Sequence, residues 1–192
     1  MALVKRTGVS IVAALVAATM AVSGAYANDD ARFEVRRAST TLTDNVFFLN
    51  AELYYRLSPQ AIEALDNGVN LTVDVEIEIL RSRRWRIDPE VAALKQSFQL
   101  AFNALSRRYV VLNLNSGAQR SYSSLNASLT AMGQIAELPV IDAALLDSEG
   151  RYIIRIRSVL DQQKLPGSLQ LLAFWSDGYR LESDWYSWIL SE

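Results

Sequence analysis

The chain has 192 residues, of which 19 are basic and 21 acidic, and its 51% hydrophobic and 21% charged content is that of a globular protein rather than a disordered one. It contains no cysteine and no histidine, which excludes disulfide bonds, thiolate nucleophiles, imidazole bases and metal sites built on either residue. Enzyme chemistry is thereby reduced to carboxylates, lysines and hydroxyls, and a binding role is favoured.

The first 27 residues have the organisation of a signal peptide. Lys5 and Arg6 precede an apolar run from Val9 to Val22, and Ala25-Tyr26-Ala27 fits the pattern of small residues at a cleavage site. The run is shorter than the roughly 20 residues that a spanning helix needs, although an uncleaved anchor is the competing interpretation. We therefore expect cleavage after Ala27, a periplasmic or secreted location, and a single globular domain over residues 28–192 without an integral membrane span.

Loss of this segment would leave 17 basic and 21 acidic residues, so the remaining chain has no overall attraction for nucleic acid. It also has no glycine-rich phosphate loop and no aspartate-rich calcium loop. We expect no nucleic-acid partner, no cofactor and no metal.

Two alternating segments separated by a short helix open the predicted domain. Residues 49–57 and 69–79 alternate apolar with polar side chains, which is typical of strands that have one buried and one solvent-facing side. Between them, Ser58 and Pro59 are typical of a helix start, and Gly68 of the residue that follows a helix end. The predicted order is strand, helix, strand.

The segment from Val91 to Leu105 fits both helical and strand periodicity. We favour a turn over Asp88 to Leu94 and a strand from about Gln96, partly because of the family resemblance given below. Residues 108–114 are β-branched and apolar enough for another strand, and Ser124 is expected to cap a helix. The apolar face of that helix would comprise Leu125, Leu129, Met132 and Ile135.

Strand patterns return over residues 140–146 and 151–160, separated by a turn at 147–150. Residues 165–167 break the chain, 169–175 are apolar, and 179–190 complete the domain after a second turn. About seven strands and two short helices predict a mainly β or α+β fold, specifically an antiparallel β-sandwich-like single domain.

Three carboxylates, Asp74, Glu76 and Glu78, share the polar side of one predicted strand. Alternate strand residues lie roughly 6.6 Å apart, near the lower limit of the carboxyl separation in inverting glycosidases. One hypothesis is therefore a carboxylate-dependent hydrolase of envelope glycan that uses these residues as catalytic groups. The simpler interpretation is that they are surface residues paired with arginines on neighbouring strands.

Two clusters are candidate binding residues. The first consists of Arg81, Arg83, Arg84 and Arg86 around Trp85. Guanidinium groups can hold phosphate or carboxylate, so this cluster could contact a lipid headgroup or an acidic protein, unless the arginines serve cross-strand pairing. The second consists of Trp185 and Trp188, which could bind sugars or proteins or could pack in the core. Their spacing of three prevents both from facing the same side of a regular strand.

Several motifs carry a family resemblance: Leu138-Pro139, Tyr152 to Arg157, Leu160-Asp161, Leu165-Pro166, Leu181, Ser183, Trp185 and Trp188. They resemble an exported proteobacterial family known as domain of unknown function 4390. In this chain Tyr179 stands where that family has a tryptophan. Residues 49–57, Ala64-Leu65, Gly68 and the segment from Phe98 to Tyr109 extend the resemblance towards the N-terminus.

The resemblance implies a small exported protein that is sometimes encoded near a membrane sensor kinase, and it implies no catalytic or binding residues. Our first hypothesis is therefore a non-enzymatic periplasmic domain that binds an envelope or membrane-protein partner, for which a sensor kinase is a candidate.

Overall fold

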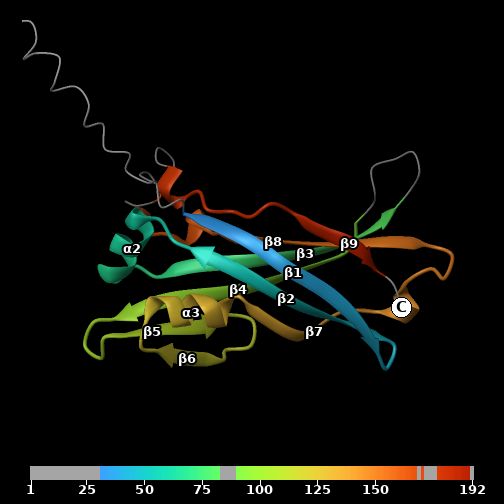
Figure 1. The fold of residues 1–192 in the computed structure, drawn as a ribbon, viewed down its shortest axis with the longest axis horizontal. Coiled ribbons are helices and arrows are strands. Elements are labelled where there is room, and N and C mark those ends of the chain that lie inside the picture. Colours follow the sequence, from blue (N-terminus) through green and yellow to red (C-terminus); the bar gives the residue numbers. More distant parts are fainter. Residues whose placement is uncertain (1–30, 83–89, 168–169, 171–176, 191–192) are drawn as a thin grey trace, which may run out of the picture. The chain divides into compact units, whose positions relative to one another are not determined.

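The computed structural model describes residues 31–82, 90–167, 170 and 177–190 (Figure 1). Most of these residues belong to antiparallel strands, with two short α-helices at the connections. The elements are β1 (Arg32–Thr43), β2 (Val46–Arg56), α2 (Pro59–Asp66), β3 (Leu71–Ser82), β4 (Glu90–Asn103), β5 (Arg108–Asn113), β6 (Gln119–Tyr122), α3 (Leu125–Met132), β7 (Gln134–Asp142), β8 (Arg151–Leu160) and β9 (Tyr186–Leu190).

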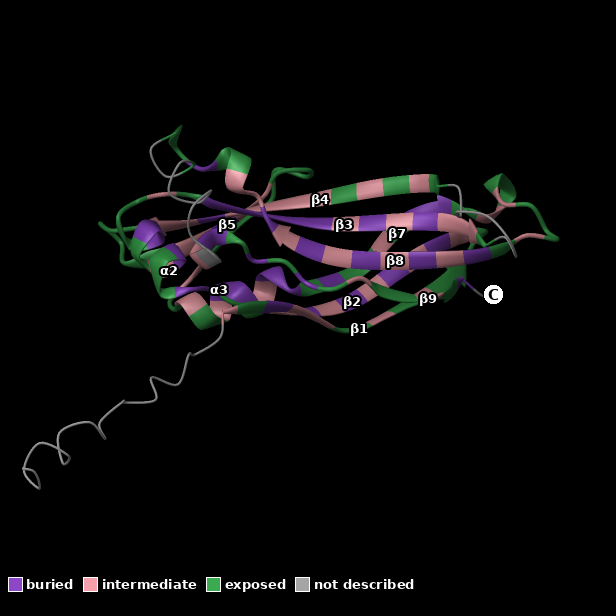
Figure 2. Ribbon diagram, turned by 90° about the horizontal axis from the view of Figure 1, so that it is seen from above, coloured by how far each residue is buried: buried purple, intermediate pink, exposed green. Residues whose placement is uncertain are grey.

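The strands form two sheets. The larger has the order β6-β5-β4-β3-β8-β9 and the smaller the order β1-β2-β7, and every neighbouring pair is antiparallel. The smaller sheet lies against one face of the larger, with α3 beside it over β5 and β6 (Figures 1 and 2). This arrangement confirms the predicted antiparallel, β-sandwich-like fold.

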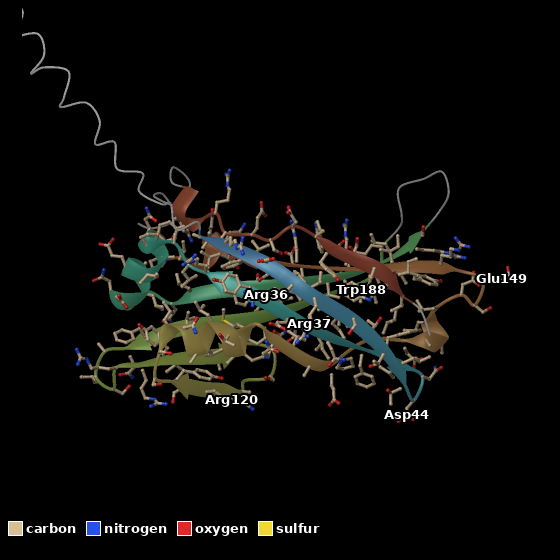
Figure 3. All side chains as sticks on the ribbon, viewed as in Figure 1. Arg36, Arg37, Asp44, Arg120, Glu149 and Trp188 are labelled. Carbon is tan, nitrogen blue, oxygen red and sulfur yellow. The ribbon has the colours of Figure 1, made fainter. Side chains whose placement is uncertain are left out.

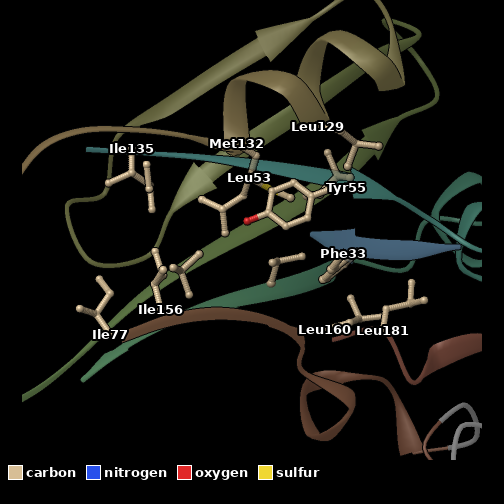
Figure 4. Close-up of a cluster of buried hydrophobic side chains, with 14 of the residues drawn as sticks. Phe33, Leu53, Tyr55, Ile77, Leu129, Met132, Ile135, Ile156, Leu160 and Leu181 are labelled. Atoms are coloured by element: carbon tan, nitrogen blue, oxygen red, sulfur yellow. The ribbon is translucent and has the colours of Figure 1, made fainter. Parts of the chain in front are cut away.

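The core lies between the two sheets. Alternate side chains of β3 and β8 point inward, among them Ile77, Ile79, Ile154 and Ile156, all of which are fully buried. They meet side chains from β2 and α3, as the alternation of buried and less buried positions in Figure 2 and the close-up in Figure 4 show. Since successive strand residues point to opposite faces, the remaining positions of β3 and β8 project from the outer face of the larger sheet.

Strands β2 and β3 and helix α2 confirm the strand, helix, strand order expected from the sequence. Ser58 caps α2, since its Oγ accepts a hydrogen bond from the Ala61 amide at 3.0 Å. Gly68 follows the helix with φ of +85°, a conformation that glycine adopts without the usual steric cost. These local signals depend on neighbouring residues alone, which is why the sequence pattern predicts them well.

The turn expected up to Leu94 is wrong where the structure describes it, because β4 already begins at Glu90. Ala92 and Leu94 pair with Ile79 and Ile77 of β3 and pack against the core. Pairing with a buried strand therefore decides the conformation of a segment whose own periodicity is ambiguous.

The second helix is shorter than expected, and Ile135 belongs to β7 instead. Gly133 ends α3 where the chain passes directly against β2: the Leu53 amide donates to the Gly133 carbonyl at 2.8 Å, and a Cβ on Gly133 would lie 2.1 Å from the Leu53 carbonyl oxygen. Strand β7 therefore begins at Gln134 rather than near residue 140. It ends at Asp142, and residues 143–145 form a 3₁₀ turn instead of continuing the strand.

Strand β1 has no counterpart among the predicted elements. Its register shifts between Val35 and Arg37, which interrupts the alternation that would have marked it. Only residues 186–190 of the expected C-terminal strand are in regular strand conformation. Within the described ranges, no helix has the length and apolar composition needed to cross a membrane.

Candidate functional site

The predicted carboxylates lie on the outer face of the larger sheet, and two of them are held by arginines. Glu78 Oε2 accepts hydrogen bonds from Arg155 Nε and Nη2 at 2.8 and 2.6 Å. Glu76 Oε2 accepts one from Arg157 Nε at 2.7 Å. Both contacts join residues that are directly opposite across β3 and β8, so they confirm the interpretation as cross-strand pairs.

Trp185 lies across these two arginines. The guanidinium carbons of Arg155 and Arg157 are 4.3 and 4.6 Å from the centroid of the indole ring, within the range of cation–π contacts. We call Glu76, Glu78, Arg155, Arg157 and Trp185 the outer ladder. Each member is fixed by another, so the ladder presents one geometry.

Trp188 faces the opposite side of β9, as the spacing of three positions predicts. Its Nε1 donates to Thr40 Oγ1 at 3.2 Å, and the side chain lies between β9 and β1 (Figure 3). It also packs partly against the core. Trp188 therefore ties the C-terminal strand to the smaller sheet, whereas Trp185 belongs to the outer surface.

Asp74 departs from the expectation that every polar residue of β3 faces solvent, since it is only 3% exposed. Ser97 Oγ donates to its Oδ1 at 2.7 Å, and Lys95 Nζ contacts its Oδ2 at 2.5 Å. Lys164 Nζ lies 3.6 Å from Oδ1. The burial of Asp74 is possible because one serine and two lysines replace the lost water.

The charge state of this cluster follows from the same contacts. Burial alone would raise the pKa of Asp74, but the hydrogen bonds from Lys95 and Ser97 and the charge of Lys164 outweigh it, so the pKa of Asp74 is lowered. In turn, the hydrogen bond to Asp74 raises the pKa of Lys95. At neutral pH the cluster consists of an ionised aspartate and a protonated lysine.

A groove with a volume of about 400 Å³ opens beside Asp74, and we call it the Asp74 groove. Its lining comprises Asp74, Glu76 and Lys95 from β3 and β4, residues 159–163 at the end of β8, and residues 180–182. The last two segments are joined by a hydrogen bond from the Leu160 amide to the Leu181 carbonyl at 2.8 Å, and Gln162 Nε2 donates to the Tyr179 carbonyl at 2.9 Å.

Sequence reasoning missed this groove. The sequence offered only one hint, the scarcity of lysine, since Lys95 and Lys164 are the only lysines after Lys5. Both contact the same aspartate, which no local pattern could reveal.

The first predicted cluster can be placed only at Arg81. Its Nη2 donates to Asp147 Oδ2 at 2.5 Å, in the turn before β8. The other members, Arg83, Arg84, Trp85 and Arg86, lie outside the described residues. In the described part of the chain, no group of three acidic side chains is arranged to hold a metal ion.

The outer ladder and the Asp74 cluster suit fixed recognition better than proton transfer. A glycosidase needs one carboxylic acid with a raised pKa, because that group must donate a proton to the leaving oxygen. The pKa of Asp74 is shifted the opposite way, and Glu76 and Glu78 are each engaged by an arginine. No observation at these residues favours the hydrolase hypothesis.

Comparison with known protein families identifies the family to which the chain is similar. The family described as a domain of unknown function (DUF4390) matches residues 30–189, which include every described element from β1 to β8 and most of β9. Neither the comparison with curated proteins nor that with solved structures found a match.

Proposed function

Because the chain belongs to the family of domain of unknown function 4390, whose description assigns no activity, we propose that it is a non-enzymatic periplasmic domain that binds an envelope or membrane protein. The observation that supports this proposal best is the outer ladder, in which Trp185 rests on Arg155 and Arg157. The predicted signal peptide supports the location.

The outer ladder has the residue types and the rigidity of an interface centre. Tryptophan and arginine are enriched among the residues that dominate binding energy in protein interfaces. Here the arginines are already held by Glu76 and Glu78, so a partner would not have to immobilise them. Each arginine is also about a third exposed, which leaves part of its surface for a partner.

The resemblance suggests which partner to test first. Proteins of this family are sometimes encoded near a membrane sensor kinase, and the outer ladder would contact the part of such a protein outside the membrane. Its alternating charges favour a polar partner surface over an apolar one.

Capture from a native envelope extract, followed by a binding measurement with the purified partner, tests the proposal. The variants are Trp185→Ala and, as a matched control on the edge strand β6, Arg120→Ala. We expect a stoichiometric membrane protein to bind the wild-type chain and the control, and the Trp185→Ala variant to bind about 30-fold more weakly, as for a central interface residue.

Two outcomes would contradict the proposal. A partner that binds the Trp185→Ala variant as well as the wild type would show that the outer ladder is not the interface. Absence of any stoichiometric partner would argue against a protein-binding role. Circular dichroism of each variant ensures that lost binding does not reflect lost folding.

A further inference from the structure

We propose that the Asp74 groove binds a neutral saccharide. The groove shares Glu76 with the outer ladder, and a saccharide there would add a small-molecule ligand to the protein-binding role proposed above. Three features of the groove support saccharide binding, namely its size, its charge balance and its free hydrogen-bonding groups, and so does an aromatic ring near it.

The size and lining of the Asp74 groove fit a small polar molecule. Its volume of about 400 Å³ lies within the usual range of small-molecule sites, roughly 300–1,000 Å³. Charged and amide side chains supply most of its lining. A lipid chain or another apolar ligand would leave these groups without hydrogen bonds, and each such loss is costly.

The charges of the groove cancel locally. Asp74 is offset by Lys95, Glu76 by Arg157, and Lys164 is shared between Asp74 and Asp161. The two remaining charges, those of Arg180 and Glu182, both belong to the lining and have opposite signs. A ligand with a net charge therefore gains little attraction overall, which favours a neutral one.

Both donors and acceptors remain available for a ligand. The side-chain amide of Gln163 and the guanidinium of Arg180 have no hydrogen-bond partner among the described residues. The Glu182 carboxylate lies 3.9 Å from Arg157 Nη1 and is 56% exposed, so its acceptor capacity is largely unused. A polyhydroxylated ligand uses donors and acceptors together, because each hydroxyl can both give and accept a hydrogen bond.

Trp185 does not line the groove, but it offers an aromatic surface one residue away from it. Arg157 contacts both Trp185 and Glu76, and Glu76 lines the groove, so the ring and the groove share one neighbour. Sugar rings present apolar C–H faces alongside their hydroxyls, and an aromatic ring beside a polar groove can pack against such a face. The combination distinguishes a saccharide from a simple polar solute.

Calorimetric titration of the full chain with the tetramer of N-acetylglucosamine tests the proposal. We expect saturable binding with a Kd of about 0.1–1 mM, which is nearly independent of salt because the ligand is neutral. Arg180→Ala and Gln163→Ala should each weaken binding about 5-fold, the loss expected for one hydrogen bond. Arg120→Ala, on the distant strand β6, should bind as the wild type does.

Several outcomes would overturn the proposal. The first is the absence of saturable binding, and the second is binding by the Arg180→Ala and Gln163→Ala variants as tight as that of the wild type. The third is tighter, salt-dependent binding of a tetramer of galacturonic acid, which would indicate an anion site instead. Chromatography of the recovered tetramer should show it intact, since cleavage would contradict a binding role.

The Arg180→Ala variant separates this proposal from the previous one. It should bind the saccharide about 5-fold more weakly while still capturing the protein partner through Trp185 as the wild type does. If the partner is absent but the saccharide binds, only the proposed protein-binding role fails.

Discussion

Replacement of Asp74 by asparagine should destabilise the protein by about 2 kcal/mol at neutral pH. The substitution keeps the shape of the side chain and removes its charge. Asp74 accepts hydrogen bonds from Ser97 and Lys95, and a hydrogen bond to a charged group contributes about 1.5–3 kcal/mol. The lysines left behind are 51% and 43% exposed, so water can solvate them, and the cost stays below the 3–5 kcal/mol of a fully buried broken pair.

The effect should depend on pH in a specified direction. The folded-state pKa of Asp74 lies below its unfolded value, so its ionised form stabilises the protein above pH of about 4. This contribution is lost as the pH falls through the folded-state pKa. The variant never has it, so the stability difference between wild type and variant should be largest near neutral pH and should shrink in acid.

Urea unfolding monitored by tryptophan fluorescence at several pH values measures this difference. The expected loss corresponds to a fall in Tm of about 4–8 °C for a domain of this size. Glu182→Gln is the matched control, because that carboxylate is largely exposed and should contribute less than about 0.5 kcal/mol. A variant as stable as the wild type at neutral pH, or a difference that does not change with pH, would refute the reasoning.

Two further substitutions test the local structure by thermal unfolding. Ser58→Ala should cost about 1–2 kcal/mol, because the buried hydroxyl caps α2 and also donates to the Gly178 carbonyl, and an unchanged Tm would contradict this role. Gly133→Ala should cost about 3 kcal/mol or more, because the new methyl group would overlap the Leu53 carbonyl. Gly167→Ala, which meets nothing within 4 Å, should leave the Tm nearly unchanged, and equal effects at both glycines would show that the close approach is not limiting.

The sequence predicted those parts of the fold that depend on neighbouring residues. Regular alternation identified β2 and β3, and the serine and proline at the start of α2 identified that helix. Where alternation was interrupted by the bulge in β1, no strand was predicted. Where two periodicities competed, in residues 91–94, pairing with β3 decided the outcome.

The candidate site was predictable only in part, for a related reason. Strand geometry predicts that Trp185 and Trp188 face opposite sides. The alternation of β3 also led us to expect arginine partners for Glu76 and Glu78, although it did not identify which arginines. The burial of Asp74 was not expected, because it requires Lys95 and Lys164, which approach from different elements. A sequence pattern reports which face a residue occupies but not what another segment places on that face.

The position of β8 beside β3 has a consequence for how the chain folds. The Glu78–Arg155 contact at the centre of the larger sheet joins residues that are 77 positions apart. Closing so long a loop costs conformational entropy before the paired strands contribute any stabilising contact. Folds dominated by contacts between distant residues therefore reach the native state slowly. Strands β3 to β6 can pair successively as hairpins, whereas the sheet is complete only when β8 and β9 join them. Until then the edge of β3 that pairs with β8 has no partner strand, and this open edge is exposed to other chains.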